Sequence, residues 1–255
     1  MSDIEGVLLD VDGVLVRSWQ AIPGAVDATD WMRGEGIPFR CVTNTTQLGR
    51  AGLTAMLREA GFDVVPEEVI TASVATGAYL RKHHPGARCF LLAGDDAKPD
   101  LEGVEFTDGE AEVVVMGDAE EAFSYENMNK AFRMLMNGAK LVAMHKNLYW
   151  NTDEGLTLDV GAFVVGLEAA SGAEAVVVGK PSPDFFLSAL ESIGQPPGKV
   201  AMVGDDIVSD VLAAEAAGMT GVLVKTGKFR PKDLEREMRP RHVIDSIADL
   251  PKLLA

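Results

Sequence analysis

The sequence has few cysteines, few aromatic residues and no long apolar run. Its two cysteines lie in the apolar stretches FRCVT and RCFLL, and no group of cysteines and histidines has zinc-site spacing. We therefore expect Cys41 and Cys89 to be buried free thiols in a reducing compartment. No stretch is long enough to cross a bilayer, and the acidic start MSDIEG does not resemble a signal peptide. These absences predict a cytoplasmic protein.

Positive charge is also scarce. The 255 residues include 23 basic and 39 acidic side chains, which gives a formal net charge of −16. Nucleic acids and anionic membranes bind surfaces rich in lysine and arginine, so neither is an expected partner. If the protein acts on an anion, it needs a local cation, which is either a metal ion or a lysine.

Apolar β-branched runs alternate with amphipathic segments along the whole chain. This alternation predicts βα units and a doubly wound parallel sheet, that is, an α/β fold with a Rossmann-like core. Because the strands are almost entirely apolar, helices should cover both faces of the sheet. The strand candidates near the two ends of the chain are IEGVLLD, IPFRCVTN, AVVVGK, KVAMVGD, GVLVKTG and HVID.

The middle of the chain repeats this alternation and predicts a second α/β domain inserted into the first. Its strand candidates are ARCFLLAG, AEVVVMGD and AKLVAMHK, and the following passage NLYWNTDEGLTLDVG has the pattern of a hairpin or irregular loop. We assign residues 78–174 to this cap domain. Residues 1–77 and 175–255 then form a discontinuous core domain.

Polar residues follow four predicted strands of the core domain. In a doubly wound sheet, ligands bind at the carboxyl ends of the strands, so these residues should meet at one crevice. Each motif alone is weak, because a lone GDD is usually a turn and a lone GKP a helix start. Together they predict one active site, made of Asp10, Asp12, Thr43, Asn44, Lys180, Asp205, Asp206 and Asp210.

Asp10 and Asp12 pose an electrostatic problem. Residues two apart on a strand point to the same side, and neighbouring carboxylates repel unless a cation or a proton separates them. Oxygen ligands without histidine or cysteine suit Mg²⁺, which keeps several waters and also binds substrate phosphate. Asp10, Asp205 and the backbone carbonyl of Asp12 are the expected ligands. Lys180 is the expected second cation, in contact with phosphate.

The same residues suggest a reaction. A carboxylate such as Asp10 can attack phosphorus and form an aspartyl-phosphate. Asp12 can then protonate the leaving oxygen and later activate water. The Thr43 hydroxyl and the Asn44 amide suit phosphoryl oxygens. We therefore expect an Mg²⁺-dependent phosphatase.

Simpler interpretations exist for several of these residues. The Asp10–Asp12 pair can be an acidic strand end, and Lys180 can be a surface lysine beside a helix. Asp206 suits a helix N-cap as well as it suits a functional role. His145, on the run LVAMHK, is more often structural than catalytic in such a position. Because four motifs coincide, we favour the catalytic interpretation for Asp10, Asp12 and Lys180.

The motifs DVDGVL, VTN, VVVGKP and MVGDDIVSD resemble, in this order, the four motifs of the haloacid dehalogenase-like hydrolase superfamily. The long insert is similar to the α/β cap of subfamily IIA. HKNLYW, GKPSPDFF and GMTGVLVKTGKF most resemble members like phospholysine phosphohistidine inorganic pyrophosphate phosphatase. The resemblance implies that Asp10 is the nucleophile, Asp12 the acid/base and Asp205 an Mg²⁺ ligand. It also implies phosphate binding by the VTN motif and Lys180, with Asp210 supporting the metal or the lysine.

Two other functions are compatible with parts of this pattern: a receiver-like phosphoaccepting domain and a catalytically silent interaction protein. A receiver is half this length and lacks the second aspartate, and a silent relative should have lost a motif residue.

We expect the insert to roof the crevice and to restrict entry to small phosphorylated metabolites, with pyrophosphate or P–N compounds implied by the resemblance. Asn147 and Tyr149 are candidates for specificity. The sequence leaves a homodimer open.

Overall fold

The computed structural model describes residues 1, 3–152, 155–235 and 239–255, with the backbone alone for 150–152. Contacts between Cα atoms divide the chain into two compact units, and we describe each unit by itself. The main divisions fall at 70/71 and 179/180, whereas the assignment from sequence placed the inserted domain at residues 78–174. Unit 1 comprises Met1–Thr43, Arg50–Ile70 and Lys180–Ala255, and unit 2 comprises Asn44–Gly49 and Thr71–Gly179.

Unit 1 is built on a six-stranded sheet with the order β15-β14-β13-β1-β4-β5. The central strand β1 pairs in parallel with β13 and β4, and β13 pairs in parallel with β14. The predicted doubly wound α/β fold is therefore confirmed. The strands are β1 (Gly6–Asp10), β4 (Phe39–Thr43), β5 (Val69–Thr71), β13 (Val200–Gly204), β14 (Thr220–Val224) and β15 (His242–Ile244), with a small β2 (Val16–Arg17) and β3 (Gln20–Ala21) ribbon beside them.

Helices cover both faces of this sheet because alternate strand residues point to opposite sides. Val7 and Leu9 of β1 pack with residues of α1, α2 and α8, whereas Leu223 of β14 packs with Ile207 and Val211. Complete burial of one such side chain contributes about 1.5–3 kcal/mol. The helices of unit 1 are α1 (Ala25–Gly34), α2 (Arg50–Glu59), α6 (Pro183–Ile193), the π-helical turn η5 (Ile207–Leu212), α7 (Ala213–Ala216) and α8 (Leu250–Leu254), and its 3₁₀ turns are η1 (Pro66–Glu68), η4 (Pro197–Lys199), η6 (Pro231–Glu235) and η7 (Ile247–Asp249).

Helix α6 shows how local sequence sets the ends of an element. The Ser182 hydroxyl accepts the N–H of Asp184 as N-cap, and Pro183 occupies the first helical position, where its missing N–H has no effect. The helix ends at Gly194, which takes the left-handed conformation with φ of 71°. These start and stop signals agree with the helix predicted from PDFFLSALESIG.

Unit 2 contains a separate five-stranded sheet with the order β12-β9-β8-β6-β7 and parallel pairing throughout. The strand β12, which comes last in the sequence of unit 2, corrects one prediction made from the sequence. The run AVVVGK was assigned to the core domain, but β12 pairs with β9 in the sheet of unit 2. Lys180 therefore does not extend a strand of the unit 1 sheet. The strands are β6 (Arg88–Leu92), β7 (Glu105–Phe106), β8 (Val113–Met116), β9 (Lys140–Ala143) and β12 (Ala175–Val177).

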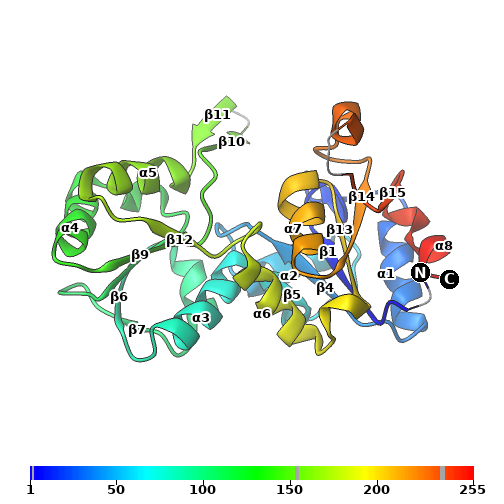
Figure 1. Ribbon diagram of the computed structural model, residues 1–255, viewed down its shortest axis with the longest axis horizontal. Coiled ribbons are helices and arrows are strands. Elements are labelled where there is room, and N and C mark those ends of the chain that lie inside the picture. The colour runs from blue at the N-terminus through cyan, green and yellow to red at the C-terminus, as the bar shows by residue number, and fades with distance from the viewer. Residues whose placement is uncertain (2, 153–154, 236–238) are drawn as a thin grey trace. The chain divides into compact units, whose positions relative to one another are not determined.

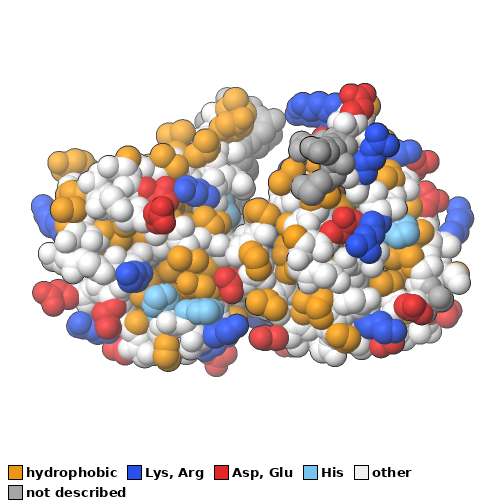
Figure 2. Space-filling view, in the orientation of Figure 1, with side chains coloured by type: hydrophobic (Ala, Val, Ile, Leu, Met, Phe, Trp, Pro, Cys, Tyr) orange, Lys and Arg blue, Asp and Glu red, His pale blue; other side chains and the backbone are white. Residues whose placement is uncertain are grey.

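The helices of unit 2 lie on both sides of this sheet, with α4 and α5 on one face and α3 on the other (Figure 1). Of the two alternatives predicted for NLYWNTDEGLTLDVG, a hairpin or an irregular loop, the antiparallel pair β10–β11 supports the hairpin, with residues 153–154 outside the described residues. Exposed apolar side chains gather on this hairpin and on α5, among them Leu156, Leu158 and Val165 (Figure 2). The elements are α3 (Ala72–His83), α4 (Tyr125–Met136), α5 (Val160–Ser171), β10 (Tyr149–Thr152) and β11 (Gly155–Leu158), with 3₁₀ turns η2 (Asp95–Leu101) and η3 (Glu120–Ala122).

Among the described residues, no helix is both long and apolar enough to cross a membrane. Both cysteines are buried and free. Burial raises the pKa of the Cys41 thiol to about 12 and that of Cys89 to about 11.

Candidate active site

The candidate site lies in unit 1, at the carboxyl end of the central strand β1. All five residues of this strand are buried, and Asp10 is its last residue. The chain then turns at Gly13, whose φ of 80° favours glycine, so Asp12 stands just beyond the strand. The side chain of Asp12 is exposed. Loss of hydration among the surrounding groups nevertheless raises the pKa of its carboxyl, although the positive charges of Lys228 and Lys180 act to lower this pKa. The two aspartates therefore sit in different environments.

Lys180 joins two of the predicted aspartates. Its Nζ lies 2.7 Å from Asp10 Oδ1 and 2.7 Å from Asp210 Oδ1, and all three side chains are buried. Burial alone would lower the pKa of Lys180, but the two carboxylates outweigh it and raise the pKa. The lysine is therefore a fixed positive charge. The simpler interpretation of Lys180 as a surface lysine does not hold, because its side chain is 4 % exposed.

Asp205 and Asp210 come from the next strand and the turn after it. Asp205 follows β13 directly, and Asp210 lies within the π-helical turn η5. Burial raises the pKa of both carboxyls to about 6, and the Asp210 charge adds to the shift at Asp205. Burial also raises the pKa of Asp10, partly offset by Lys180. One lysine does not neutralise three neighbouring carboxylates.

The donor set fits a hard divalent cation. Oxygen atoms of Asp10, Asp205 and Asp210 lie within 4.8 Å of one another. In the described part of the chain, buried Asp205 Oδ1 has no hydrogen-bond partner, which is costly unless a cation takes that place. Lys180 contacts one oxygen of both Asp10 and Asp210, which leaves Asp205 Oδ1 as the carboxylate oxygen most clearly open to a metal. An all-oxygen set of this kind suits Mg²⁺-class ions.

Asp206 has a clear local role. Its Oδ1 accepts the N–H groups of Val208 and Ser209, at 2.9 and 3.0 Å, and so caps the π-helical turn η5. Although burial would raise the pKa of this carboxyl, these N–H donors and the nearby Lys228 lower it. The capping alternative considered from the sequence thus has direct structural support. The cap also fixes the turn that carries Asp210, whose Oδ2 accepts the Asp206 N–H at 3.2 Å.

Thr43 and Asn44 fall on different sides of a unit boundary. Thr43 ends β4, the neighbour of β1, and the register pairs Asp10 with Val42, so Thr43 lies one residue beyond that pair. Its side chain is buried in unit 1. Asn44 belongs to unit 2, where it packs close to Gly179. Within unit 1, the structure therefore brings together Asp10, Lys180, Asp205 and Asp210.

Sequence reasoning missed a loop that encloses Asp205. This loop follows β14 and reads TGKF, and the Lys228 N–H donates to Asp205 Oδ2 at 2.7 Å. A Cβ atom at Gly13 or at Gly227 would collide with the same carboxylate, and the Thr226 hydroxyl donates to the Gly13 carbonyl. The signal was available, since TGK follows a predicted strand at the carboxyl edge of the sheet. A cavity of about 280 Å³ opens beside this loop, lined by Asp205, Asp206 and Lys228 among others.

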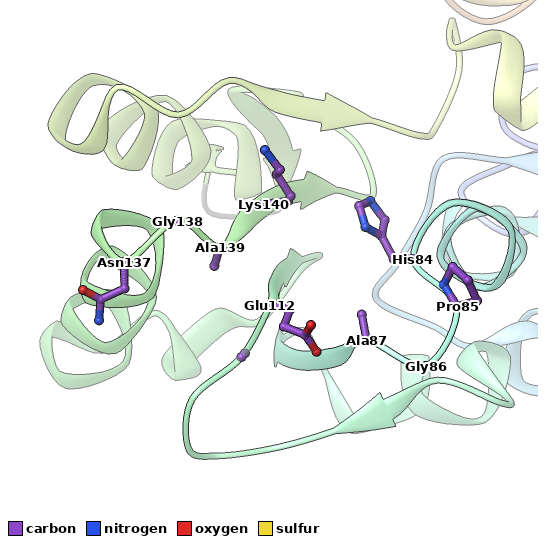
Figure 3. Close-up of a pocket in the computed structure, with 10 residues that line it drawn as sticks. His84, Pro85, Gly86, Ala87, Glu112, Asn137, Gly138, Ala139 and Lys140 are labelled. Carbon is purple, nitrogen blue, oxygen red and sulfur yellow. The ribbon is translucent and has the colours of Figure 1, made fainter.

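A larger hollow on unit 2, of about 540 Å³, does not offer comparable chemistry (Figure 3). His84, Glu112 and Lys140 line it, and they precede or begin β6, β8 and β9. The hollow thus lies at the amino ends of these strands, whereas ligands of doubly wound sheets bind at the carboxyl ends.

Three comparisons show which known proteins this chain is similar to. A family model described as haloacid dehalogenase-like hydrolase matches residues 7–107, and one described as HAD-hydrolase-like matches residues 177–250. The chain is 42% identical over 240 residues to haloacid dehalogenase-like hydrolase domain-containing protein 2 of Pongo abelii, covering 94% of this chain and 91% of that protein. It is 43% identical over 237 residues to phospholysine phosphohistidine inorganic pyrophosphate phosphatase of Xenopus laevis, covering 90% and 86%.

A solved structure extends the likeness to the whole chain. The 4-nitrophenylphosphatase of Thermotoga maritima superposes with a TM-score of 0.92 and 29% identity, covering 100% of this chain and 98% of that one. The predicted phosphatase class is supported by the phosphatases among these relatives and is confirmed. With more than 40% identity to curated relatives over most of its length, the chain belongs to the haloacid dehalogenase-like hydrolase family.

Proposed function

We propose that this protein is an Mg²⁺-dependent phosphatase of small phosphorylated compounds that works through an aspartyl-phosphate on Asp10. The observation that carries the proposal is the position of Lys180 Nζ, 2.7 Å from both Asp10 and Asp210, beside the open carboxylate of Asp205. A nucleophilic carboxylate must be ionised, but burial raises the pKa of Asp10. Lys180 and a bound cation together would keep Asp10 ionised while an anionic phosphoryl group approaches.

The proposed reaction has two steps. In the first, an Asp10 carboxylate oxygen attacks phosphorus, the bond from phosphorus to the leaving oxygen breaks, and Asp12 gives that oxygen a proton. In the second, the Asp12 carboxylate takes a proton from water, the water oxygen attacks phosphorus, and the bond to Asp10 breaks. A raised pKa for the exposed Asp12 carboxyl suits a group that must hold a proton first.

Other residues are proposed to hold and orient the phosphoryl group. Mg²⁺, held by Asp10, Asp205 and the Asp12 carbonyl, would neutralise phosphoryl oxygens and orient them for attack. Lys180 supplies a second, permanent positive charge. Thr43 and Asn44 are proposed to donate to the phosphoryl oxygens. Asp210 holds Lys180, and Asp206 holds the turn that carries Asp210.

The proposed substrates are small phosphate esters, with pyrophosphate and P–N compounds as further members of the class. One relative is named for its action on 4-nitrophenyl phosphate and another for phospholysine, phosphohistidine and pyrophosphate. A net charge of −16 disfavours polyanions such as nucleic acids. Unit 2 is inserted next to the VTN motif and before Lys180, and we propose Asn147 and Tyr149, both exposed, as residues that select the leaving group.

The covalent step is tested with Asp10→Asn. Mixing the wild-type protein with 4-nitrophenyl phosphate and Mg²⁺, followed by acid quench, should give a species heavier by one phosphoryl group in intact-mass spectra. Asp10→Asn should give no such species and should lower turnover by about 10⁴-fold or more, because the amide is a poor nucleophile. Asp30→Asn, on the exposed face of α1, is the matched control and should keep both signals. Wild-type turnover in Asp10→Asn would disprove the covalent mechanism.

The substrate class is tested by phosphate release. We expect faster turnover of small phosphate esters and of pyrophosphate than of a phosphopeptide or a folded phosphoprotein. If the folded phosphoprotein is the best substrate, the proposed class is wrong even where Asp10 is the nucleophile.

A further inference from the structure

Unit 2 contains a second buried cluster of ionisable side chains, which the proposed reaction does not use. Asp118 stands two residues after β8, and His145 stands two residues after β9. These strands are parallel neighbours, and Met116 pairs with Ala143, so the aspartate and the histidine extend from equivalent positions at the carboxyl edge of the sheet. Asp159, the N-cap of α5, completes the cluster.

The histidine in this cluster has no short hydrogen bond. His145 is 2 % exposed, and its Nε2 lies 3.5 Å from Asp118 Oδ2 and 3.9 Å from Asp159 Oδ1. Thr46 Oγ1 is 3.4 Å from the same nitrogen. Good N–H···O bonds are about 2.7–3.2 Å long. In the described part of the chain the other ring nitrogen, Nδ1, has no partner. The nitrogen that faces the two carboxyls is Nε2, and a buried nitrogen with only long contacts is costly unless another ligand binds it.

The two carboxylates also need a positive partner. Asp159 is buried and the Asp118 side chain is 15 % exposed. Among the described residues, no lysine or arginine forms an ion pair with either of them; the neighbouring Lys146 instead pairs with Glu168 at 2.6 Å. The donor oxygens of the two carboxyls lie within 4.8 Å of each other, and neighbouring carboxylates repel unless a cation or a proton separates them.

We propose that Asp118, His145 and Asp159 bind a divalent cation of the zinc class in unit 2. One imidazole nitrogen and two carboxylate oxygens are typical ligands of such an ion, and their donor atoms lie within 4.8 Å of one another. Bonds of about 2.0–2.2 Å in a tetrahedron place ligand atoms about 3.3–3.6 Å apart. The observed 3.5 and 3.9 Å therefore require only small adjustments.

Neighbouring groups already orient two of these ligands. Thr46 Oγ1 donates to Asp118 Oδ2 at 2.7 Å and accepts the Asp118 N–H at 3.0 Å, and the Val160 N–H donates to Asp159 Oδ1 at 2.7 Å. Hydrogen bonds of this kind hold ligating carboxylates in place in metal sites. The partial exposure of Asp118 leaves a route for a water as fourth ligand. A bound ion would link β8, β9, α5 and the Asn44–Gly49 segment within unit 2.

The donor chemistry separates this site from the one in unit 1. The unit 1 site offers oxygen atoms only and suits Mg²⁺, whereas the unit 2 site adds a nitrogen donor. The experiment therefore uses Asp205→Asn as background, which removes a ligand from the unit 1 site. Zinc is supplied by equilibrium dialysis against buffer containing millimolar Mg²⁺, and bound zinc per chain is measured by mass spectrometry of the elements.

We expect about one zinc per chain in Asp205→Asn and a raised thermal midpoint with zinc. Adding Asp159→Asn should reduce bound zinc at least about tenfold, while the asparagine still caps α5. Adding His145→Phe should have the same effect, and it should also remove the visible absorption of a Co²⁺-loaded sample that reports nitrogen ligation. His242→Gln, which removes a partly exposed histidine of β15, is the control and should keep the zinc.

Two results would overturn the proposal. One is less than about 0.2 zinc per chain in Asp205→Asn at micromolar free zinc. The other is undiminished zinc in the Asp159→Asn double variant. Because Asn preserves both size and capping, this variant gives a result even if His145→Phe does not fold. Neither result tests the role of Asp10, so the phosphatase proposal is independent of this one.

Discussion

The two units place ionisable side chains in the same part of a similar sheet, yet they neutralise them differently. In unit 1, Lys180 lies between Asp10 and Asp210, 2.7 Å from each, and remains charged. In unit 2, no lysine is paired with the Asp118–Asp159 carboxyls among the described residues, and His145 faces them at 3.5–3.9 Å. A permanent cation in the first cluster suits the binding of an anionic phosphoryl group. An imidazole nitrogen in the second suits a metal ion.

Metal removal should have the largest effect of the changes that we propose, and it should affect the two clusters differently. Exhaustive EDTA treatment should abolish phosphate release, and added Mg²⁺ should restore it, because burial raises the pKa of Asp10 and of Asp205 and a bound cation favours their ionised forms. A zinc-selective chelator should leave Mg²⁺-supported turnover intact. Phosphate release that persists after EDTA would contradict the metal requirement, and loss with the zinc-selective chelator would join two sites that we describe as separate.

Asp12→Asn tests proton transfer in unit 1. We expect a loss of about 10²–10⁴-fold in kcat for alkyl phosphates, because their leaving oxygen needs a proton. Loss should be smaller for 4-nitrophenyl phosphate, whose leaving group is stable as an anion, and phosphoenzyme should accumulate with this substrate. The comparison of the two substrates in one variant is its own control. Equal losses would rule out an acid role for Asp12.

Lys180→Met tests whether the buried lysine also stabilises the fold. Its removal leaves two buried carboxylates without their cation, so the free energy of unfolding at pH 8 should fall by about 3–5 kcal/mol. Lys146→Met in unit 2 breaks a partly exposed pair with Glu168 and should cost less than about 1 kcal/mol. Urea titrations of both variants give the comparison. Similar values would mean that burial does not distinguish the two lysines.

Gly227→Ala tests the loop that encloses Asp205. A methyl group at this position would collide with the carboxylate, so the Mg²⁺ concentration for half-maximal activity should rise about 10–100-fold. Gly138→Ala in unit 2 is the matched control, because its φ is also positive, at 97°, but its Cβ would meet no atom within 4 Å. An unchanged Mg²⁺ requirement in Gly227→Ala would show that this loop does not position Asp205.

The two thiols give the smallest contrast. Burial raises the pKa of Cys41 in unit 1 to about 12 and that of Cys89 in unit 2 to about 11, so both should react far more slowly with a disulfide reagent at pH 8 than in the unfolded chain. Cys89, whose pKa is raised less, should react first. Peptide mapping after partial modification identifies the order. Faster modification of Cys41 would indicate that unit 1 opens more readily than unit 2.

Local features of the sequence determined the fold class and much of the unit 1 site. Buried apolar runs that alternate with capped helices predict a doubly wound sheet, and a polar residue that ends such a run must lie at the carboxyl edge. Asp10 and Asp205 follow directly from this rule, because β1 and β13 are adjacent and parallel. Asp206 remained ambiguous, since a capping and a catalytic aspartate have the same local sequence. Its hydrogen bonds to Val208 and Ser209 show the cap.

Long-range pairing decided the rest. The strand before Lys180 pairs with β9 of unit 2, although its sequence suits either sheet, so local pattern cannot assign it. Asp118, His145 and Asp159 match no spacing motif, and His145 alone suggests a structural residue. Only the register of β8 against β9 sets Asp118 beside His145, and only the start of α5 brings Asp159 to them. The sequence specifies which side chains are present and therefore their chemistry. The distance between their charges depends on which strands pair, and strand pairing is a property of the whole fold.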